Sequence, residues 1–234
     1  MIATSLAQLH FGQVQFTGLQ LRGSVDLCGR SLLLYAMNPK SHTVLLIPGI
    51  FDRGSSLLRM QHALADAGFD THYIHLRYNS GWHGMEHLSS QLMAKMEKLV
   101  KKGATCTLVG FSMGGIVARY YLQSMNGIGR VHKFISIASP HHGSYWANFL
   151  PYKGGKQLRV GSEFLRGLNQ SIHMLETTDP VSIWTKYDVT IMPHSSAKLG
   201  IGTSYEVPVI LHRLMPMSSK VISLMKKEVI SGME

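Results

Sequence analysis

The stretch Thr105–Gly115, TCTLVGFSMGG, decides the fold that we expect for this chain. Its opening apolar run predicts a buried strand, and the IVARYYL that follows at helical spacing predicts a helix over about 113–124. Between the two, Gly110 and Gly114 flank Ser112 in the pattern G-x-S-x-G. Glycines at these positions let strand and helix approach closely around a strained serine. The sequence therefore predicts a sharp turn that exposes Ser112 at the top of a sheet.

A serine on such a turn is a candidate nucleophile. The helix behind it would direct its N-terminal amides and the positive end of its dipole at the place where an oxyanion forms. The backbone N–H of Met113 is thus one candidate oxyanion donor. The alternative is a chance Gly-Ser turn without chemical meaning, and the strand and helix on either side of the motif disfavour it.

Length and composition indicate one domain over residues 1–234. A chain of 234 residues with 45% hydrophobic and 15% charged residues suits a single α/β domain with a substantial core. Its formal net charge of +10 would attract anionic surfaces. The basic residues are scattered, so we expect no nucleic-acid binding, and a weak attraction to an anionic membrane surface stays a hypothesis. The sequence leaves the oligomeric state open.

The two cysteines, Cys28 and Cys106, imply no disulfide framework. The N-terminal segment MIATSLAQLHFG lacks the basic and long apolar regions of a secretory signal. No apolar run approaches the roughly 18 residues of a membrane helix. We therefore expect a soluble, cytoplasmic protein and leave leaderless export open.

Alternating strand and helix patterns predict an α/β fold with a mostly parallel central sheet and helices on both faces, because parallel strands need crossover connections. Two edge strands are expected within residues 1–40. The later strands are expected at 42–47, 71–78, 106–109, 134–138, 181–185 and 207–211, and helices near 55–67, 88–99, 113–124 and 218–230. The long interval 141–180, with a short helix near 162–169, is expected to form a cap-like excursion over the carboxyl ends of the strands, where ligands bind.

A serine nucleophile needs a general base and a carboxylate that orients it. Both must lie on loops at the carboxyl edge of the sheet, where Ser112 emerges. Asp188 follows the strand VSIWT, whereas Asp179 precedes it and lies at the wrong end. His212 follows the apolar run VPVIL directly. Asp188 and His212 are therefore the candidate acid and base, although each taken alone could be structural.

The second oxyanion donor is expected in the loop after the strand 42–47. There Pro48-Gly49 predicts a tight turn, and the backbone N–H of Ile50 is the candidate donor. Phe51 in the same loop is a candidate substrate-binding residue.

Trp146, Phe149 and Leu150 form an apolar cluster within the long interval. They either line an acyl pocket or pack the cap onto the body, and we favour the pocket.

The sequence assigns no metal-binding or catalytic role to four other histidines. His83 and His87 stand four residues apart, but no third ligand is evident, so we expect no metal site. His141 and His142 follow the strand FISIA, and we expect them to shape a loop rather than to catalyse.

Several stretches resemble lipases and esterases of the α/β-hydrolase superfamily, in particular bacterial triacylglycerol lipases. They are LLIPGIFD, GFSMGGIVARYYL, SIASPHHGS, GSEFLRGLN, VSIWTKYDVTIMP and VPVILHRLM, which together cover about Val44–Met215. The resemblance implies Ser112, Asp188 and His212 as a catalytic triad in the chain order of this superfamily. In one departure, this chain has Pro48-Gly49 where many such lipases have His-Gly before the oxyanion residue.

The sequence thus predicts a serine hydrolase of carboxylic esters that acts through an acyl-enzyme on a small-molecule or lipid ester and needs no cofactor. An acyltransferase or thioesterase would use the same triad, and sequence alone does not separate these enzymes. A non-catalytic protein that docks on membranes with the same fold is a third possibility, which the presence of all three residue types disfavours.

Overall fold

A parallel β-sheet forms the centre of the computed structural model, which describes residues 42–231. Within these residues its strands lie in the order β2-β1-β3-β4-β5-β6, and each neighbouring pair is parallel. The strands are β1 (Thr43–Ile47), β2 (Asp70–Tyr73), β3 (Cys106–Phe111), β4 (Val131–Ile137), β5 (Val181–Trp184) and β6 (Thr203–Glu206). The two edge strands expected within 1–40 lie outside the described residues.

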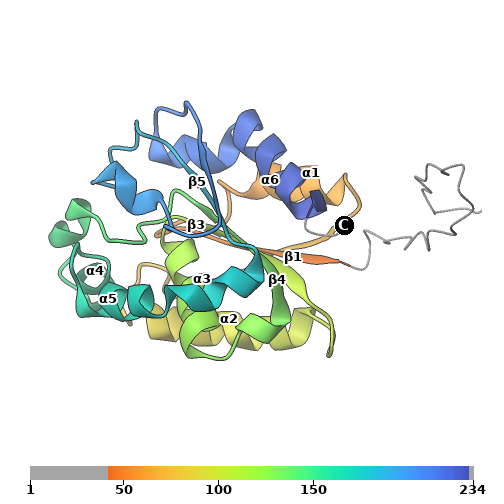
Figure 1. Cartoon of the computed structure of the whole chain (residues 1–234), viewed down its shortest axis with the longest axis horizontal. Helices are drawn as coiled ribbons and strands as arrows, with labels where there is room; N and C mark the ends of the chain where they lie inside the picture. The colour runs from red at the N-terminus through yellow and green to blue at the C-terminus, as the bar shows by residue number, and fades with distance from the viewer. Residues whose placement is uncertain (1–41, 232–234) are drawn as a thin grey trace, which may run out of the picture. The chain divides into compact units, whose positions relative to one another are not determined.

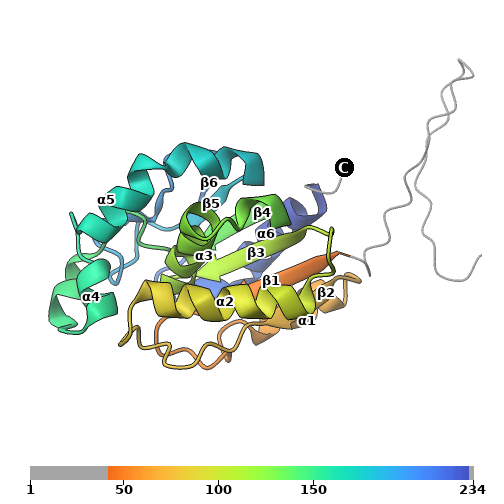
Figure 2. The same cartoon turned by 90° about the horizontal axis from the view of Figure 1, so that it is seen from below.

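Helices cover both faces of this sheet, as predicted. They are α1 (Leu58–Ala65), α2 (Met85–Leu99), α3 (Met113–Ser124), α4 (Lys153–Gln157), α5 (Glu163–Gln170) and α6 (Ser219–Ser231). Helices α1 and α6 lie together on one face, and α2 and α3 lie together on the other (Figures 1 and 2). The carboxyl ends of the strands point to the left of Figure 1. The doubly covered parallel sheet confirms the α/β fold class.

Strand β1 shows why the sheet must be covered twice. Alternate side chains of a strand point to opposite faces. Val44 and Leu46 belong to the core cluster under α1 and α6, whereas Leu45 and Ile47 belong to the cluster under α2 and α3. All four side chains are fully buried, and each such burial contributes about 1.5–3 kcal/mol. The continuous apolar run is thus explained by burial on both faces.

Strand β6 corrects one prediction. The apolar run 207–211 was expected to be a strand, but β6 consists of the preceding TSYE and pairs with β5 as far as Trp184↔Glu206. Pro208 has no N–H and cannot extend the ladder. Beyond it, Ile210 and Leu211 are exposed rather than buried. The run therefore forms a loop at the carboxyl edge of the sheet.

Strand β2 is also shorter than expected. It spans Asp70–Tyr73 instead of 71–78, although the Ile74 N–H still donates to the Leu46 carbonyl at 2.9 Å. As an edge strand, β2 has a ladder partner on one side only within the described residues. The residues that follow it form a long loop before α2.

The interval 141–180 contains the short helix predicted for it. Helix α5 begins after Ser162, whose hydroxyl accepts a hydrogen bond from the Leu165 N–H and caps the helix. It packs on α3, where the rings of Tyr120 and Phe164 stack with centroids 5.5 Å apart. The rest of the interval consists of α4 and two 3₁₀ helices, η3 (Tyr145–Phe149) and η4 (Ile172–Thr178). Among residues 42–231, no helix has both the length and the apolar composition needed to cross a bilayer.

Candidate active site

Ser112 occupies the strained turn that its sequence motif predicts. Its φ of 53° and ψ of −124° lie outside the regions that non-glycine residues favour. The neighbouring glycines have no room for side chains. A Cβ at Gly110 would lie 2.5 Å from the Cα of Gly115, and one at Gly114 would lie 2.4 Å from the Ile47 carbonyl oxygen. The close approach of β1, β3 and α3 therefore depends on glycine and holds Ser112 at the turn.

His212 connects the candidate nucleophile to the candidate acid. Its Nε2 lies 2.9 Å from Ser112 Oγ, and its Nδ1 lies 2.7 Å from Asp188 Oδ2. All three side chains are buried. An ionised carboxylate only accepts hydrogen bonds, so Nδ1–H donates to Asp188 and Nε2 is left to accept from the serine hydroxyl. The structure thus brings the three predicted residues together in hydrogen-bond reach.

His212 does not follow a strand directly, contrary to the sequence prediction. It opens the 3₁₀ helix η6 (His212–Met217), after the loop that follows β6. The loop is anchored just beyond β5, because the hydroxyl of Thr185, the residue after the strand, donates to the Val209 carbonyl at 2.8 Å. The imidazole therefore reaches Ser112 from a loop that is hydrogen-bonded to the end of β5.

Two backbone amides fix the Asp188 carboxylate, a feature that the sequence analysis missed. The N–H groups of Thr190 and Ile191 donate to Oδ1 at 2.8 and 2.9 Å, while Oδ2 faces His212. An aspartate that binds the amide two residues on is an Asx turn, so an Asp at the start of a loop was the available signal. The two amides thus hold the carboxylate in place independently of its hydrogen bond to His212.

An aromatic ring supports His212 from the side. Phe111, the last residue of β3, stacks on the imidazole with centroids 5.0 Å apart and an interplanar angle of 29°. The ring is buried and limits the orientations open to His212. The sequence analysis did not single out this residue, although it directly precedes Ser112.

The predicted oxyanion loop lies beside Ser112. The Asp52 N–H donates to the Gly49 carbonyl at 3.3 Å, and Phe51 has a φ of 56°, which together describe a type II turn. This turn bond does not use the N–H of Ile50. A Cβ at Gly49 would lie 3.1 Å from Ser112 Cβ, so the turn borders the serine.

Met113, the other candidate donor, is the first residue of α3. The amide of a first helical residue has no acceptor within its own helix. Met113 directly follows Ser112, and the role of both amides as oxyanion donors stays a prediction.

His141 has the loop-shaping environment that we expected. Its ring is completely buried, its Nε2 lies 2.9 Å from Ser136 Oγ, and burial lowers its pKa well below the ordinary value. Arg119 of α3 donates to the His141 carbonyl at 3.4 Å and to Asn169 Oδ1 at 3.0 Å. Asn169 Nδ2 lies 3.1 Å from His142 Nδ1. These contacts join the loop after β4 to α3 and α5.

The candidate substrate-binding residues are largely exposed. Trp146 and Phe149 are 54% and 76% exposed, and their ring centroids lie 5.5 Å apart. The indole N–H of Trp146 donates to the Val189 carbonyl at 2.6 Å, which ties this pair to the loop of Asp188. Leu150 is half-buried, and Phe51 is 64% exposed in the turn beside Ser112.

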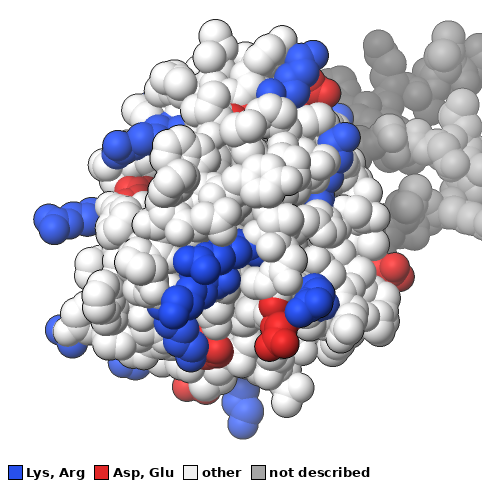
Figure 3. All heavy atoms as spheres, turned by 90° about the vertical axis from the view of Figure 1, so that its left-hand side faces the viewer, with Lys and Arg blue, Asp and Glu red and all other residues white. Residues whose placement is uncertain are grey.

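Other large apolar or aromatic side chains are exposed on the loops at the same edge of the sheet. Loops that leave the carboxyl ends of the strands expose twelve large apolar or aromatic residues: Phe51, Tyr78, Trp82, Tyr145, Trp146, Phe149, Tyr187, Val189, Met192, Ile210, Leu211 and Leu214. Figure 3 shows this face, where an uncharged area crosses the upper and middle part and charged groups gather below it and at the edges. Exposed apolar side chains gathered at one edge are candidates for substrate contact.

His83 and His87 lie close together, as their spacing in the sequence suggests. The two ring centroids lie 5.2 Å apart. In the part of the chain that the structure describes, no three His, Cys, Asp or Glu residues are grouped to hold a metal ion.

Comparison with known proteins identifies the family of the chain. A model of the palmitoyl protein thioesterase family matches residues 43–187, which is more than half of the chain. The matched region begins at β1 and includes Ser112 and the loop up to Tyr187, just before Asp188. No curated protein sequence matches the chain.

Solved structures show the fold. The mature form of Bacillus licheniformis lipase BlEst2 has a TM-score of 0.64 at 15% identity, over 82% of this chain and 93% of that one. Aspergillus fumigatus lipase B has a TM-score of 0.64 at 15% identity, over 77% of this chain and 52% of that one. The ydeN gene product of Bacillus subtilis has a TM-score of 0.60 at 14% identity, over 82% and 98%. The chain has the α/β-hydrolase fold, and at these identities the likeness extends to the fold alone.

Proposed function

Because the chain belongs to the palmitoyl protein thioesterase family, we propose that it hydrolyses acyl thioesters and esters with Ser112 as nucleophile, His212 as general base and Asp188 as the acid that orients His212. A hydrolase of the lipase, esterase or thioesterase type is the coarser assignment, which fold and family share. The observation that carries the finer proposal is the continuous hydrogen-bonded path from Ser112 Oγ through His212 to Asp188, at 2.9 and 2.7 Å.

The proposed reaction has two halves. His212 Nε2 takes the hydroxyl proton as Ser112 Oγ attacks the acyl carbon, and Asp188 stabilises the imidazolium that forms. The imidazolium then gives its proton to the departing thiolate or alkoxide, which leaves an acyl-enzyme. Water, deprotonated by the same Nε2, attacks the acyl carbon and releases the carboxylic acid and Ser112. The N–H groups of Ile50 and Met113 would stabilise the oxyanion in both halves.

The family match changes the order of the candidate substrates. The sequence alone favours carboxylic esters and leaves a thioesterase as an alternative, whereas the family description names a palmitoyl protein thioesterase, and palmitoyl is a long acyl chain. The uncharged area in Figure 3 suits such a chain. We therefore propose long-chain acyl thioesters first and esters of the same acids second. No observation favours acyl transfer to an acceptor other than water.

The cap assignment of 141–180 also becomes more specific in this proposal. Helix α5 packs against α3, and Thr178 and Leu175 of η4 are buried, so this half of the interval belongs to the body. The half that contains Trp146, Phe149 and Leu150 would border the acyl chain. The cytoplasmic location and the attraction to anionic membranes stay predictions of the sequence.

Hydrolysis of a palmitoyl thioester of N-acetylcysteamine and of p-nitrophenyl esters of short and long acids tests the proposal. Ser112→Ala should lower kcat by about a thousandfold or more, because it removes the nucleophile. Ser90→Ala is the matched control, since it removes a serine hydroxyl from the exposed side of α2. A fluorophosphonate should label the native protein and Ser90→Ala but not Ser112→Ala. Native protein that neither hydrolyses any of these substrates nor takes the label would refute the proposal.

A further inference from the structure

A polar cavity opens next to the candidate oxyanion turn. It has a volume of about 460 Å³ and lies between the loops that follow β1 and β2. Its lining consists of Asp52, Arg53, His75, Leu76, Arg77, Tyr78 and Asn79. The catalytic steps proposed above use none of these residues.

The guanidinium groups of Arg53 and Arg77 make the lining of the cavity positively charged. Arg53 and Arg77 are exposed, and within residues 42–231 neither guanidinium makes a hydrogen bond or an ion pair. The one carboxylate of the lining, that of Asp52, is already engaged. It accepts hydrogen bonds from the Gly54 N–H at 2.8 Å and from the Ser56 hydroxyl. The cavity therefore offers two free cations to an anionic ligand.

The frame of the cavity is held by hydrogen bonds. The Phe51 N–H donates to the Asn79 carbonyl at 3.3 Å and joins the two loops. The Asp52 carbonyl accepts from the side-chain amide of Asn79 and from the Tyr73 hydroxyl. The backbone N–H and carbonyl of Arg77 are both bound by the side chain of Gln91, at 2.7 and 3.0 Å. Such a frame lowers the cost of ordering the site when a ligand binds.

The cavity lies within reach of Ser112. The turn bond from the Asp52 N–H to the Gly49 carbonyl keeps the two Cα atoms within about 7 Å. Gly49 itself borders Ser112. The cavity therefore borders the turn that lies against Ser112.

The order of the strands separates this cavity from most of the apolar surface. Strand β3, which carries Ser112, has β1 and β2 on one side and β4, β5 and β6 on the other. Most of the twelve exposed apolar residues are on loops after β4, β5 and β6. A substrate whose acyl chain lies on the loops after β4, β5 and β6 would thus have its leaving group on the other side of Ser112.

We propose that the cavity lined by Arg53 and Arg77 binds a phosphate group carried by the leaving group of the substrate. The guanidinium fork matches phosphate oxygens, and two forks at one cavity can contact two oxygens of one phosphate group. The phosphate could come from a coenzyme A thioester or from a phospholipid, which share this chemistry. This inference rests on the proposed function, because it names the class of leaving group for the same site.

The test compares each phosphate-bearing substrate with a phosphate-free partner of the same acyl chain. Palmitoyl-CoA is paired with the palmitoyl thioester of N-acetylcysteamine, and dipalmitoyl phosphatidylcholine with dipalmitoylglycerol in the same mixed micelles. Arg53→Gln and Arg77→Gln should each lower the ratio of kcat/KM within one pair about tenfold, as the loss of one charge-assisted contact predicts. The pair that shows the effect identifies the source of the phosphate.

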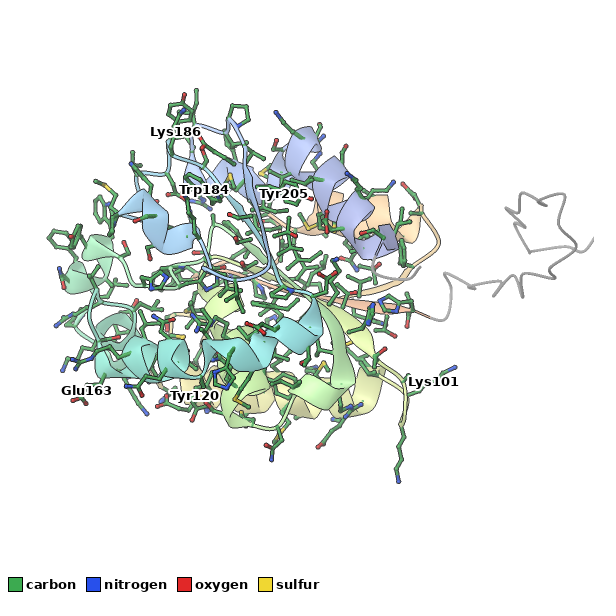
Figure 4. All side chains as sticks on the ribbon, viewed as in Figure 1. Lys101, Tyr120, Glu163, Trp184, Lys186 and Tyr205 are labelled. Atoms are coloured by element: carbon green, nitrogen blue, oxygen red, sulfur yellow. The ribbon has the colours of Figure 1, made fainter. Side chains whose placement is uncertain are left out.

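Lys101→Gln is the matched control, because it removes one positive charge at an exposed position on the side of the molecule opposite Lys186 and Glu163 (Figure 4). It should leave both ratios unchanged. Arginine variants that leave the ratios unchanged, or a control that lowers them equally, would overturn the phosphate site while the proposed function stands.

Equilibrium binding of free CoA and of glycerophosphocholine separates the two proposals if no acyl substrate is hydrolysed. Tighter binding by the native protein than by Arg53→Gln and Arg77→Gln would support the phosphate site although the proposed function had failed. Absence of binding to the native protein would overturn the site as well.

Discussion

The substitution Asp188→Asn tests whether the hydrogen bonds of the site fix the tautomer of His212. The Asp188 carboxylate accepts from the amides of Thr190 and Ile191 through Oδ1 and from His212 Nδ1 through Oδ2. In the asparagine variant the two amides, which can only donate, should retain the side-chain oxygen. The side-chain NH₂ would then face Nδ1, and the imidazole could only accept there. Its proton would move to Nε2, where it blocks proton transfer from Ser112.

The expected loss follows from this tautomer. A triad whose histidine is held in the wrong tautomer loses roughly 10⁴ in kcat, which is about 5.5 kcal/mol at about 1.36 kcal/mol per decade. The opposite orientation of the asparagine would place its NH₂ against two N–H donors and leave both amides without acceptors, at a cost of about 1–3 kcal/mol for that of the buried Ile191. The two amides thus make the orientation unambiguous. This argument predicts a nearly isosteric variant that folds normally and is almost inactive.

Initial rates on p-nitrophenyl palmitate and the palmitoyl thioester of N-acetylcysteamine measure the effect, with circular dichroism and thermal melting as checks on folding. The label from a fluorophosphonate should slow in parallel, because it needs the same base. A folded Asp188→Asn protein with activity within tenfold of the native protein would refute the argument. His212 would then take its tautomer from something other than Asp188.

Two further predictions concern the frame around the site. Gly115→Ala should lower the free energy of unfolding by about 1–3 kcal/mol, because the new Cβ would lie 2.1 Å from Ser139 Oγ. Gly167→Ala in α5 is its matched control and should raise the free energy of unfolding by about 0.5–1 kcal/mol, since nothing lies within 4 Å of a Cβ built there. Thermal melts in which both variants shift the melting temperature in the same direction would contradict this prediction. Below pH 6.5 His141 should bind a proton in the unfolded state but stay neutral in the folded state, where burial lowers its pKa. This group should therefore lower the free energy of unfolding by up to about 1.36 kcal/mol for each pH unit that the pH drops. Urea unfolding of the native protein and of His141→Gln between pH 7.5 and 5.5 checks this, and equal slopes for the two proteins would rule out His141 as the cause.

The turn around Ser112 was predictable from sequence because Gly110, Ser112 and Gly114 are close together in the chain. The steric conflict at Gly110 arises within the motif, whereas the one at Gly114 arises with Ile47 of β1, which the motif does not contain. The strand before it and the helix after it carry strong and different periodicities. The structure accordingly has α3 at Met113–Ser124, the range that the pattern predicts.

The contacts that support the triad were less accessible from sequence. Phe111 meets His212 across a separation of about a hundred residues, and no local pattern encodes the pairing. The amides that hold Asp188 belong to an irregular loop, where propensities say little beyond the Asx turn. Asp188 and His212 were found by a topological rule, since all carboxyl ends of a parallel sheet meet at one edge. That rule gives the edge of the sheet and leaves the supporting residues open.

The prediction of a strand at 207–211 was wrong for a physical reason. An apolar run of this length is typical of a strand buried on both faces, and β1 shows that the rule works inside the sheet. At 207–211 the same composition leaves Ile210 and Leu211 exposed on the catalytic edge, where His212 begins η6. If this edge binds an acyl chain, its apolar side chains complete their burial only with the substrate. The rule that apolar runs belong to the core therefore fails at the part of the surface that the proposed substrate would cover.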